Sequence, residues 1–177
     1  AKAIVHQTIV IEADIFADGH DRLGARVCWR AADESQWTYV AMRPASNDRW
    51  RAVVHADRIG EHVFDIEAWW DPFGSLLHDL SRKRDASVAF DAEVDELRTY
   101  LARLRSAAGE PHVSLLDQLL DGLDRLAPAD AADALATEEA RALVDACHDR
   151  PFLVRLDAPR RILVERRAAA FASWYEL

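Results

Sequence analysis

At 177 residues the chain is long enough for one ordinary domain or two small ones, and half of its residues are apolar, so it can bury a core. The formal net charge of −9 argues against a nucleic-acid binder that is held by phosphate contacts. No apolar run approaches the roughly 20 residues of a membrane-spanning helix, and no export signal is visible, so we predict neither a membrane nor a nucleic-acid partner.

The first half of the chain has the period of half-buried strands. In residues 9–16, every second position is apolar and falls on one face, and turn residues occupy 18–21. The same alternation or β-branched texture recurs, between turn signals, at 25–30, 37–42, 50–55 and 64–70. Short strands spaced about ten residues apart are typical of an antiparallel sandwich.

Two neighbouring tryptophans end the last of these strands. Their side chains must point to opposite faces, because successive residues of a strand alternate. Trp70 shares its face with Ile66 and Ala68, which predicts that Trp70 lies in the core. Trp69 is then expected to face solvent, another domain or a partner. Residues 71–74 have turn chemistry and end the run of strands.

From about Asp91 the apolar period changes from 2 to 3.6 residues. One helical stripe falls within 94–104 and a second within 116–126, and each is followed by a proline. A third begins near Asp130 or Thr137, either of which can act as an N-cap, and ends before Pro151. Three amphipathic helices joined by short loops predict a small antiparallel bundle.

Strand texture returns after this bundle, at 152–154 and 161–165. We therefore predict an α+β fold, in which one antiparallel β-sandwich is interrupted by an inserted three-helix bundle. The predicted divisions are 1–88 for the first part of the sandwich, 89–151 for the helical insert and 152–177 for the final strand and the start of a connection to a further domain.

No constellation of catalytic, cofactor-binding or metal-binding residues is evident. The seven histidines are scattered, and no GxGxxG or Walker-type loop joins a strand to a helix. Cys28 and Cys147 have no CxxC spacing, and we interpret them as small buried hydrophobes in a reducing cytoplasm. Paired carboxylates such as Asp95 and Glu96 are typical of a solvated helix surface. We predict no catalytic residue, cofactor or metal in this sequence.

Four segments have more specific sequences: Val10–Asp21, Asn47–Trp50, Phe64–Phe73 and Phe171–Leu177. In this order they resemble the amino-terminal region of the alpha-1,4-glucan:maltose-1-phosphate maltosyltransferases, a family of the alpha-amylase superfamily. The resemblance runs from end to end, but the helical insert contributes no specific motif.

This resemblance implies an immunoglobulin-like sandwich with a helical insert, which precedes a catalytic (β/α)₈ barrel in a bacterial cytoplasmic enzyme. The parent enzyme would transfer maltosyl from maltose 1-phosphate to an alpha-1,4-glucan with retention of configuration. Its catalytic residues would belong to the barrel, so none is carried over to this chain. The family's chain continues beyond Leu177 and starts before Ala1, so we expect this sequence to be trimmed at both ends.

In that family the sandwich and its insert build much of a homodimer interface, so the resemblance implies a positional role. The domain would fix the dimer and flank the neighbouring barrel's acceptor side. Exposed positions of the insert are interface candidates, together with Trp69, Asp71, Pro72 and Phe73. The candidates for contact with the chain's own barrel are Phe171, Trp174 and Tyr175.

Two other functions stay open at this point. One is a stand-alone carbohydrate-binding module, whose tryptophans would contact an alpha-glucan. The other is a protein-interaction sandwich of an unrelated enzyme. The first predicts retardation of the chain in a gel that contains glucan, and the second does not.

Overall fold

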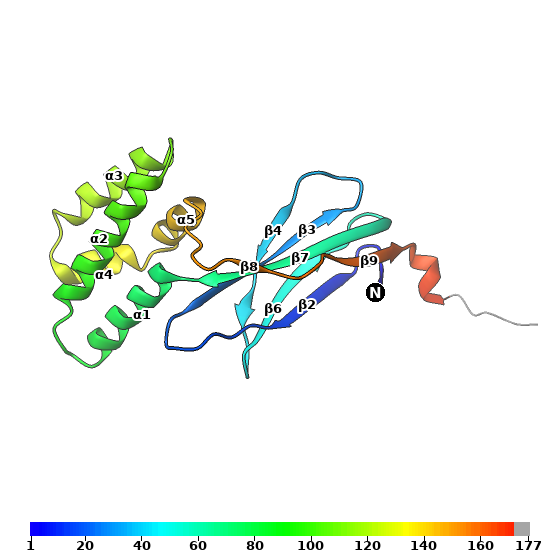
Figure 1. Cartoon of the computed structure of the whole chain (residues 1–177), viewed down its shortest axis with the longest axis horizontal. Coiled ribbons are helices and arrows are strands. Elements are labelled where there is room, and N and C mark those ends of the chain that lie inside the picture. Colours follow the sequence, from blue (N-terminus) through cyan, green and yellow to red (C-terminus); the bar gives the residue numbers. More distant parts are fainter. Residues whose placement is uncertain (172–177) are drawn as a thin grey trace, which may run out of the picture. The chain divides into compact units, whose positions relative to one another are not determined.

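The computed structural model describes residues 1–171, which form two compact units (Figure 1). The sheet unit consists of residues 1–19, 23–70 and the described residues from 152 onward. The helical unit consists of residues 20–22 and 71–151. Helices and strands thus belong to different units, which makes the fold α+β as predicted.

The larger sheet has the strand order β1-β9-β7-β3-β4, and β8 also pairs with β7. Its strands are β1 (Lys2–Ile4), β3 (Leu23–Ala31), β4 (Thr38–Ala41), β7 (Gly60–Trp70), β8 (Val154–Arg155) and β9 (Arg160–Glu165). The two longest strands, β3 and β7, run antiparallel with Leu23 opposite Trp70. The first strand, β1, pairs in parallel with the last strand, β9. The prediction of a purely antiparallel sandwich is therefore wrong for this pair. A 3₁₀ turn, η1 (Arg167–Phe171), lies beyond β9.

The smaller sheet is antiparallel and has the order β2-β6-β5. Its strands are β2 (Thr8–Asp14), β5 (Arg43–Pro44) and β6 (Arg49–His55). The strands expected from alternation are therefore present as β2, β3, β4, β6 and β7. Strands β1 and β5 were not expected from the sequence, since segments of two or three residues are too short to have a period.

Both sheets contribute their inner faces to one hydrophobic core. Alternate residues of β6 face it, and Trp50 and Val54 pack there with Val27 and Ile66 of the larger sheet. Burying each large apolar side chain contributes about 1.5–3 kcal/mol. The indole N–H of Trp50 donates to the carbonyl oxygen of Ile15 at 3.1 Å, so burial leaves that polar group satisfied.

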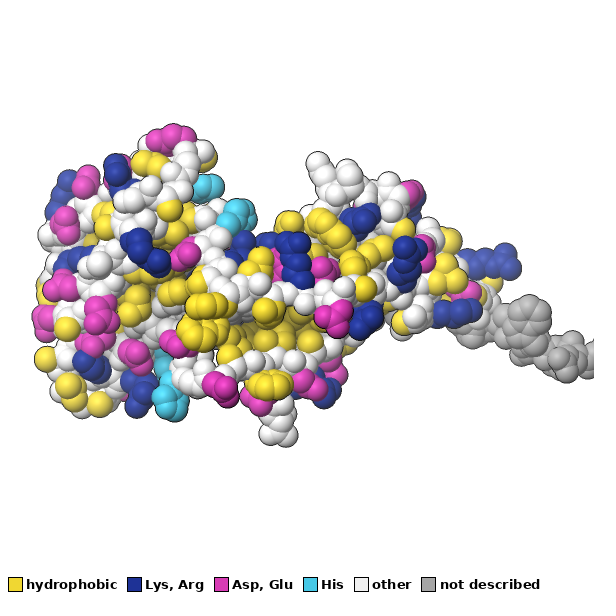
Figure 2. Space-filling view, in the orientation of Figure 1, with side chains coloured by type: hydrophobic (Ala, Val, Ile, Leu, Met, Phe, Trp, Pro, Cys, Tyr) yellow, Lys and Arg dark blue, Asp and Glu magenta, His cyan; other side chains and the backbone are white. Residues whose placement is uncertain are grey.

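The helical unit contains five α-helices within residues 71–151. They are α1 (Pro72–Asp85), α2 (Asp91–Ala107), α3 (His112–Leu123), α4 (Pro128–Leu135) and α5 (Glu138–Ala146). Their apolar stripes meet in a second core around Phe73, Leu97, Leu101 and Leu116. On the face seen in Figure 2, acidic and basic side chains are interspersed over these helices. Within residues 1–171, no helix has the length and hydropathy needed to cross a membrane.

The predicted three-helix count is too low, for two local reasons. The stretch 71–74 was interpreted as a turn, but Asp71 accepts a hydrogen bond from the Gly74 amide at 3.0 Å and caps α1, with Pro72 at the first helical position. The third predicted helix is divided in two at Thr137, whose hydroxyl accepts from the Ala140 amide and caps α5. The helical unit is therefore longer than the predicted insert.

Residues 20–22 belong to the helical unit although they come soon after β2 in the sequence. The amide of Arg22 donates to the Ser75 hydroxyl, and its carbonyl accepts from the Asp71 amide, both at 2.8 Å. Its guanidinium lies 2.9 Å from Nδ1 of His78. These contacts fix the start of α1 to a segment about 50 positions earlier in the chain.

Candidate functional site: a groove between α1 and α2

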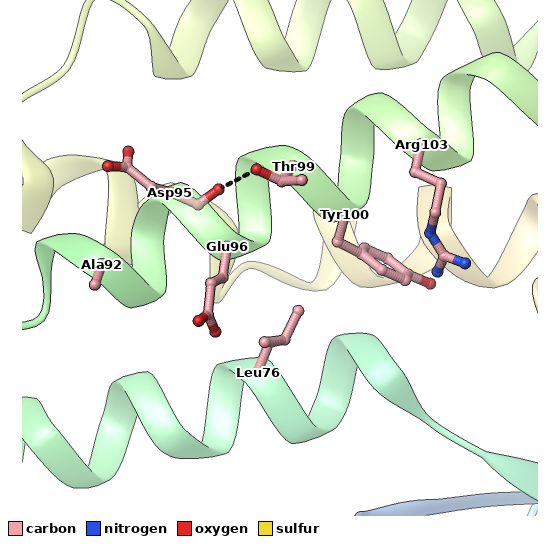
Figure 3. Close-up of a pocket in the computed structure, with 7 residues that line it drawn as sticks. All are labelled: Leu76, Ala92, Asp95, Glu96, Thr99, Tyr100 and Arg103. Carbon is pink, nitrogen blue, oxygen red and sulfur yellow. Dashed lines mark hydrogen bonds between the residues drawn. The ribbon is translucent and has the colours of Figure 1, made fainter.

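An open groove with a volume of about 560 Å³ lies between α1 and α2 (Figure 3). It is lined by one residue of α1, Leu76, and by six of α2: Ala92, Asp95, Glu96, Thr99, Tyr100 and Arg103. The α2 residues recur at intervals of three or four positions, so they form one stripe along the helix. We call these seven residues the α1/α2 groove.

Tyr100 is the buried residue of the groove. Its ring packs against that of Phe73, with centroids 6.0 Å apart, and its hydroxyl donates to the Asp149 carboxylate at 3.0 Å. Burial, followed by the nearby charge of Asp149, raises the pKa of Tyr100 well above its ordinary value of 10. The phenol therefore stays protonated and acts as a fixed hydrogen-bond donor.

Arg103 is held from two sides yet remains exposed. Its Nη2 donates to the same Asp149 carboxylate oxygen at 3.2 Å, and its guanidinium carbon lies 5.2 Å from the centre of the Tyr100 ring. The side chain is nevertheless 66% exposed. One end of the α1/α2 groove therefore presents a positioned cation with hydrogen-bond donors still directed to solvent.

The other end of the groove is acidic. The Glu96 carboxylate points across the groove toward α1 and Leu76 (Figure 3), and no ion pair or hydrogen bond engages it among residues 1–171. Asp95, beside it, accepts from Arg98 at 3.0 Å. The Thr99 hydroxyl donates to the Asp95 carbonyl and is thus turned onto its own helix. The groove combines an unpaired anion, a positioned cation and an apolar floor, which suits recognition of a charged surface.

Three of the four predicted interface residues are buried: Trp69 is 8%, Asp71 9% and Phe73 0% exposed. Asp71 caps α1 and also accepts from Arg141 at 2.6 Å, and Phe73 packs in the helical core. Pro72 is half-buried. That this segment contacts a second subunit stays a prediction, but these side chains offer little exposed surface for it.

The predicted exposure of the tryptophan pair is wrong. The two indoles are on opposite faces of β7, but Trp69 is buried and Trp70 only half-buried. Trp69 lies over Gly24 of β3, where a Cβ atom would come within 2.6 Å of the indole. A glycine on the facing strand thus provides a place for Trp69 that alternation within β7 does not reveal.

Trp70 packs instead against an exposed aromatic residue. Its ring lies 4.6 Å from that of Phe152, which is 70% exposed and has a φ of 56°, a conformation rarely adopted by a bulky residue. Leu153 and Val154 continue the exposed apolar surface, at 41% and 61%. We call these four residues the β8 strip.

Two of the predicted barrel-contact residues, Trp174 and Tyr175, lie outside the described residues, as does the side chain of Phe171. Their contact with a catalytic barrel therefore stays a prediction.

An ion-pair cluster around a buried carboxylate of the larger sheet was not expected from the sequence. Glu67, 2% exposed, accepts from Arg26 at 2.6 Å and pairs with Arg155 at 2.5 Å. Burial favours a higher pKa for Glu67, but the hydrogen bonds and charges of the two arginines outweigh it and lower the pKa. The three residues are on three strands, so only β3, β7 and β8 pairing brings them together.

The two cysteines are free thiols, with Cys28 buried and Cys147 half-buried. Burial is the main cause that raises the pKa of Cys28 to about 11, which keeps it protonated and unreactive at neutral pH. Within residues 1–171, no group of three or more histidine, cysteine, aspartate or glutamate side chains could hold a metal ion.

Comparison with known proteins adds a family match. Residues 1–166 match the family model described as alpha-1,4-glucan:maltose-1-phosphate maltosyltransferase, domain N/S. Proteins with that enzyme's name are similar along the whole chain, with 37% identity in Burkholderia pseudomallei, 34% in Cereibacter sphaeroides and 33% in Pseudomonas aeruginosa. The alignments cover 99%, 100% and 100% of this chain but 16%, 30% and 27% of those proteins.

Proposed function

The chain belongs to the alpha-1,4-glucan:maltose-1-phosphate maltosyltransferase family, as its domain N/S, and on that premise we propose that it is a non-catalytic, positional part of such an enzyme. The proposed enzyme transfers maltosyl from maltose 1-phosphate to an alpha-1,4-glucan in the cytoplasm. This domain holds two subunits together and positions the catalytic part.

The exposed β8 strip is the observation that supports a positional role. Folded proteins seldom expose contiguous apolar patches without a partner, and an edge strand such as β8 presents unpaired backbone groups. The larger sheet carries this strip, through the pairing of β8 with β7. We propose that the strip is covered by the catalytic part of the polypeptide.

The dimerising role is proposed for exposed residues of the helical unit. Trp69, Asp71 and Phe73 are buried, so the contact with a second subunit is assigned to the outer faces of the helices. The α1/α2 groove supports this assignment, since it carries opposite charges at its two ends above an apolar floor.

Two measurements on the purified chain test these roles. Light scattering over a series of concentrations is expected to give a dimer mass, and a monomer at every concentration would contradict the dimerising role. Phosphate release from maltose 1-phosphate, with glycogen present, is expected to be undetectable. Release by the chain alone would contradict the non-catalytic assignment, and the Pseudomonas aeruginosa relative is the positive control for the assay.

A second candidate function is contact with an alpha-glucan, and the Trp70–Phe152 pair favours it. The two rings are tilted by 52°, and aromatic faces stack on the apolar faces of sugar rings. A native gel containing glycogen would retard the chain if this surface binds glucan.

We also propose that the two sheets form an immunoglobulin-like sandwich. The shared core and the antiparallel β3–β7 pair support this proposal, whereas the parallel β1–β9 pair is a local departure from it. Superposition of an experimental structure on immunoglobulin domains, strand by strand, tests it.

A further inference from the structure

We propose that the edge of the larger sheet at β4 binds an alpha-1,4-glucan chain through two aromatic rings, each of which is backed by an arginine. The residues are Trp37 and Tyr39 with Arg30 and Arg26, and we call them the β4 edge. The proposal rests on the proposed function only in the choice of an alpha-1,4-glucan as the sugar polymer. The site is separate from the β8 strip, because β7 and β3 lie between β8 and β4 in the sheet.

The two rings lie on the outer face of the larger sheet. Trp37 directly precedes β4 and Tyr39 is its second residue, so they are two positions apart, which is about 7 Å along a strand. Tyr39 lies opposite Cys28 of β3, whereas the neighbours of Cys28, Val27 and Trp29, point into the core. Tyr39 is 53% exposed and Trp37 is half-buried. The β4 edge therefore presents two aromatic rings in a row.

An arginine of β3 covers one face of each ring. The guanidinium carbon of Arg26 lies 3.8 Å from the centre of the Tyr39 ring, and that of Arg30 lies 4.6 Å from the centre of the Trp37 ring. Because both arginines come from β3, they cover the ring faces that look toward β3, and the opposite faces look past the edge of the sheet. Cation–π contacts hold the rings in place, so little side-chain freedom is lost when a ligand stacks on them.

The two arginines are already paired within the sheet unit. Arg26 donates to the Glu67 carboxylate at 2.6 Å. Arg30 donates to the carbonyl oxygens of Ala31 and Ala32, at 3.2 and 3.1 Å. Neither cation needs a charged partner, so the surface favours a neutral ligand over an anionic one. A glucan is neutral, and its sugar rings have apolar faces bordered by hydroxyl groups.

The backbone of β4 supplies hydrogen-bonding groups beside the rings. The strand ends the order of the larger sheet, so within residues 1–171 one row of its N–H and C=O groups has no neighbouring strand (Figure 1). Sugar hydroxyls both donate and accept, so they can pair with both kinds of group while the sugar rings stack on Trp37 and Tyr39. Ser35 and Gln36, both exposed and directly before Trp37, add further polar partners.

An added peptide strand suits this edge less well than a glucan does. Strand addition takes its affinity from main-chain hydrogen bonds, and β4 is only four residues long. Very short edge strands are one means by which proteins discourage such pairing. A glucan uses the ring faces as well as the backbone groups, and the spacing of the rings along the edge favours a chain of repeated units.

Electrophoresis in gels that contain glycogen tests the proposal. Tyr39→Ala is expected to bind glycogen about threefold to tenfold more weakly than the wild type, which is typical of the loss of one aromatic contact. Tyr39→Phe keeps the ring and should stay within about twofold of the wild type. Maltoheptaose added to the gel should restore the mobility that the wild type has without glycogen. Circular dichroism and urea unfolding check that the variants are folded.

Tryptophan fluorescence provides an independent measurement. Maltoheptaose is expected to change the emission of the wild type, and the change should be smaller in Trp37→Phe, which keeps a ring but lacks the indole at the site. Phe16→Ala is the matched control, because it removes a 76% exposed ring elsewhere in the sheet unit and should bind glycogen like the wild type.

The outcomes separate the β4 edge from the other proposals. Wild-type retention of Tyr39→Ala overturns the β4 edge as a glucan site, even if Phe152→Ala shows that the β8 strip binds glucan. Equal weakening by Tyr39→Phe and Tyr39→Ala overturns stacking on the ring. A wild-type chain that glycogen does not retard overturns glucan binding at both surfaces. It leaves the dimerising and non-catalytic roles standing, since light scattering and phosphate release test those.

Discussion

The two units differ in the kind of surface that each offers for a contact. The sheet unit buries a carboxylate, Glu67, between two arginines and exposes a strip of apolar side chains beside β8. The helical unit also buries a carboxylate against an arginine, Asp71 against Arg141, but its α1/α2 groove exposes two opposite charges, Glu96 and Arg103. An exposed apolar strip suits a permanent contact, whereas exposed complementary charges suit a reversible one.

Phenylalanine truncation should distinguish the two units most strongly. Phe73→Ala removes a fully buried ring from the helical core and is expected to cost about 3–5 kcal/mol of unfolding free energy. Phe152→Ala removes an exposed ring and is expected to cost about 0.5 kcal/mol or less. Urea unfolding followed by helical circular dichroism measures the first. Equal losses would show that the β8 strip is not a free surface.

Neutralising a glutamate in each unit gives the next contrast. Glu67→Gln leaves the largely buried guanidinium of Arg26 without its counter-charge and is expected to cost about 3 kcal/mol. Glu96→Gln changes an unpaired surface carboxylate and should stay within about 0.5 kcal/mol. Tryptophan fluorescence measures the Glu67 variant, because the five tryptophans among residues 1–171 lie in the sheet unit. A loss below about 1 kcal/mol for Glu67→Gln would show that water solvates the Arg26 guanidinium in the variant.

The sheet unit should contribute a loss of stability at acidic pH. The pKa of Glu67 is lowered in the folded state, so the unfolded chain binds more protons as the pH falls below the ordinary value of 4.5. The stabilisation is therefore present above that value and is lost on acidification. Between about pH 5 and about pH 3, the stability of Glu67→Gln should fall less steeply than that of the wild type, as urea titrations at each pH would measure.

The helical unit should contribute a loss of stability at alkaline pH. The pKa of Tyr100 is raised above 10, so its stabilisation is complete below that value and is lost as the pH rises further. Tyr100→Phe removes the hydrogen bond to Asp149 and should cost about 1 kcal/mol at neutral pH. The variant should also lose less stability than the wild type in strong alkali. Parallel alkaline curves would rule out Tyr100 as the source.

The smallest expected effect is on the retention of the chain in a gel that contains glucan. If the Trp70–Phe152 pair contacts alpha-glucan, Phe152→Ala should bind glycogen a few-fold more weakly than the wild type. The variant should therefore move faster in a gel that contains glycogen. Phe16→Ala is the matched control, since Phe16 is 76% exposed and its ring has no aromatic partner among residues 1–171. Equal mobility of the wild type and the two variants would contradict glucan binding by the Trp70–Phe152 pair. The β8 strip would then remain a candidate for protein contacts only.

Much of the local structure was predictable from the sequence. Alternation within residues 9–16 and 50–55 located β2 and β6, and the 3.6-residue period after Asp91 located α2 and α3. The first helix was missed at residues 71–74, where the same four residues can form a turn or a capped helix start. The hydrogen bond from the Ser75 amide to the Asp71 carbonyl, at 2.9 Å, has the i to i+4 pattern of a helix and distinguishes the two.

The candidate site was less predictable. Asp95 and Glu96 were correctly placed on an exposed helix surface, but the groove requires Leu76 of a helix that the sequence analysis had not found. The position of Arg103 depends on Asp149, 46 residues later in the chain. The same holds for Glu67, whose two arginines come from neighbouring strands.

Contiguous motifs and local periods were enough to identify the family, the α+β class and most of the elements, because these depend on residues that are neighbours in the chain. Which side chains are exposed became known only from the folded molecule. Trp69 was expected at the surface and is buried because Gly24, on another strand, leaves room for its indole. Exposure depends on what packs opposite a residue, and that partner is usually far away in the sequence.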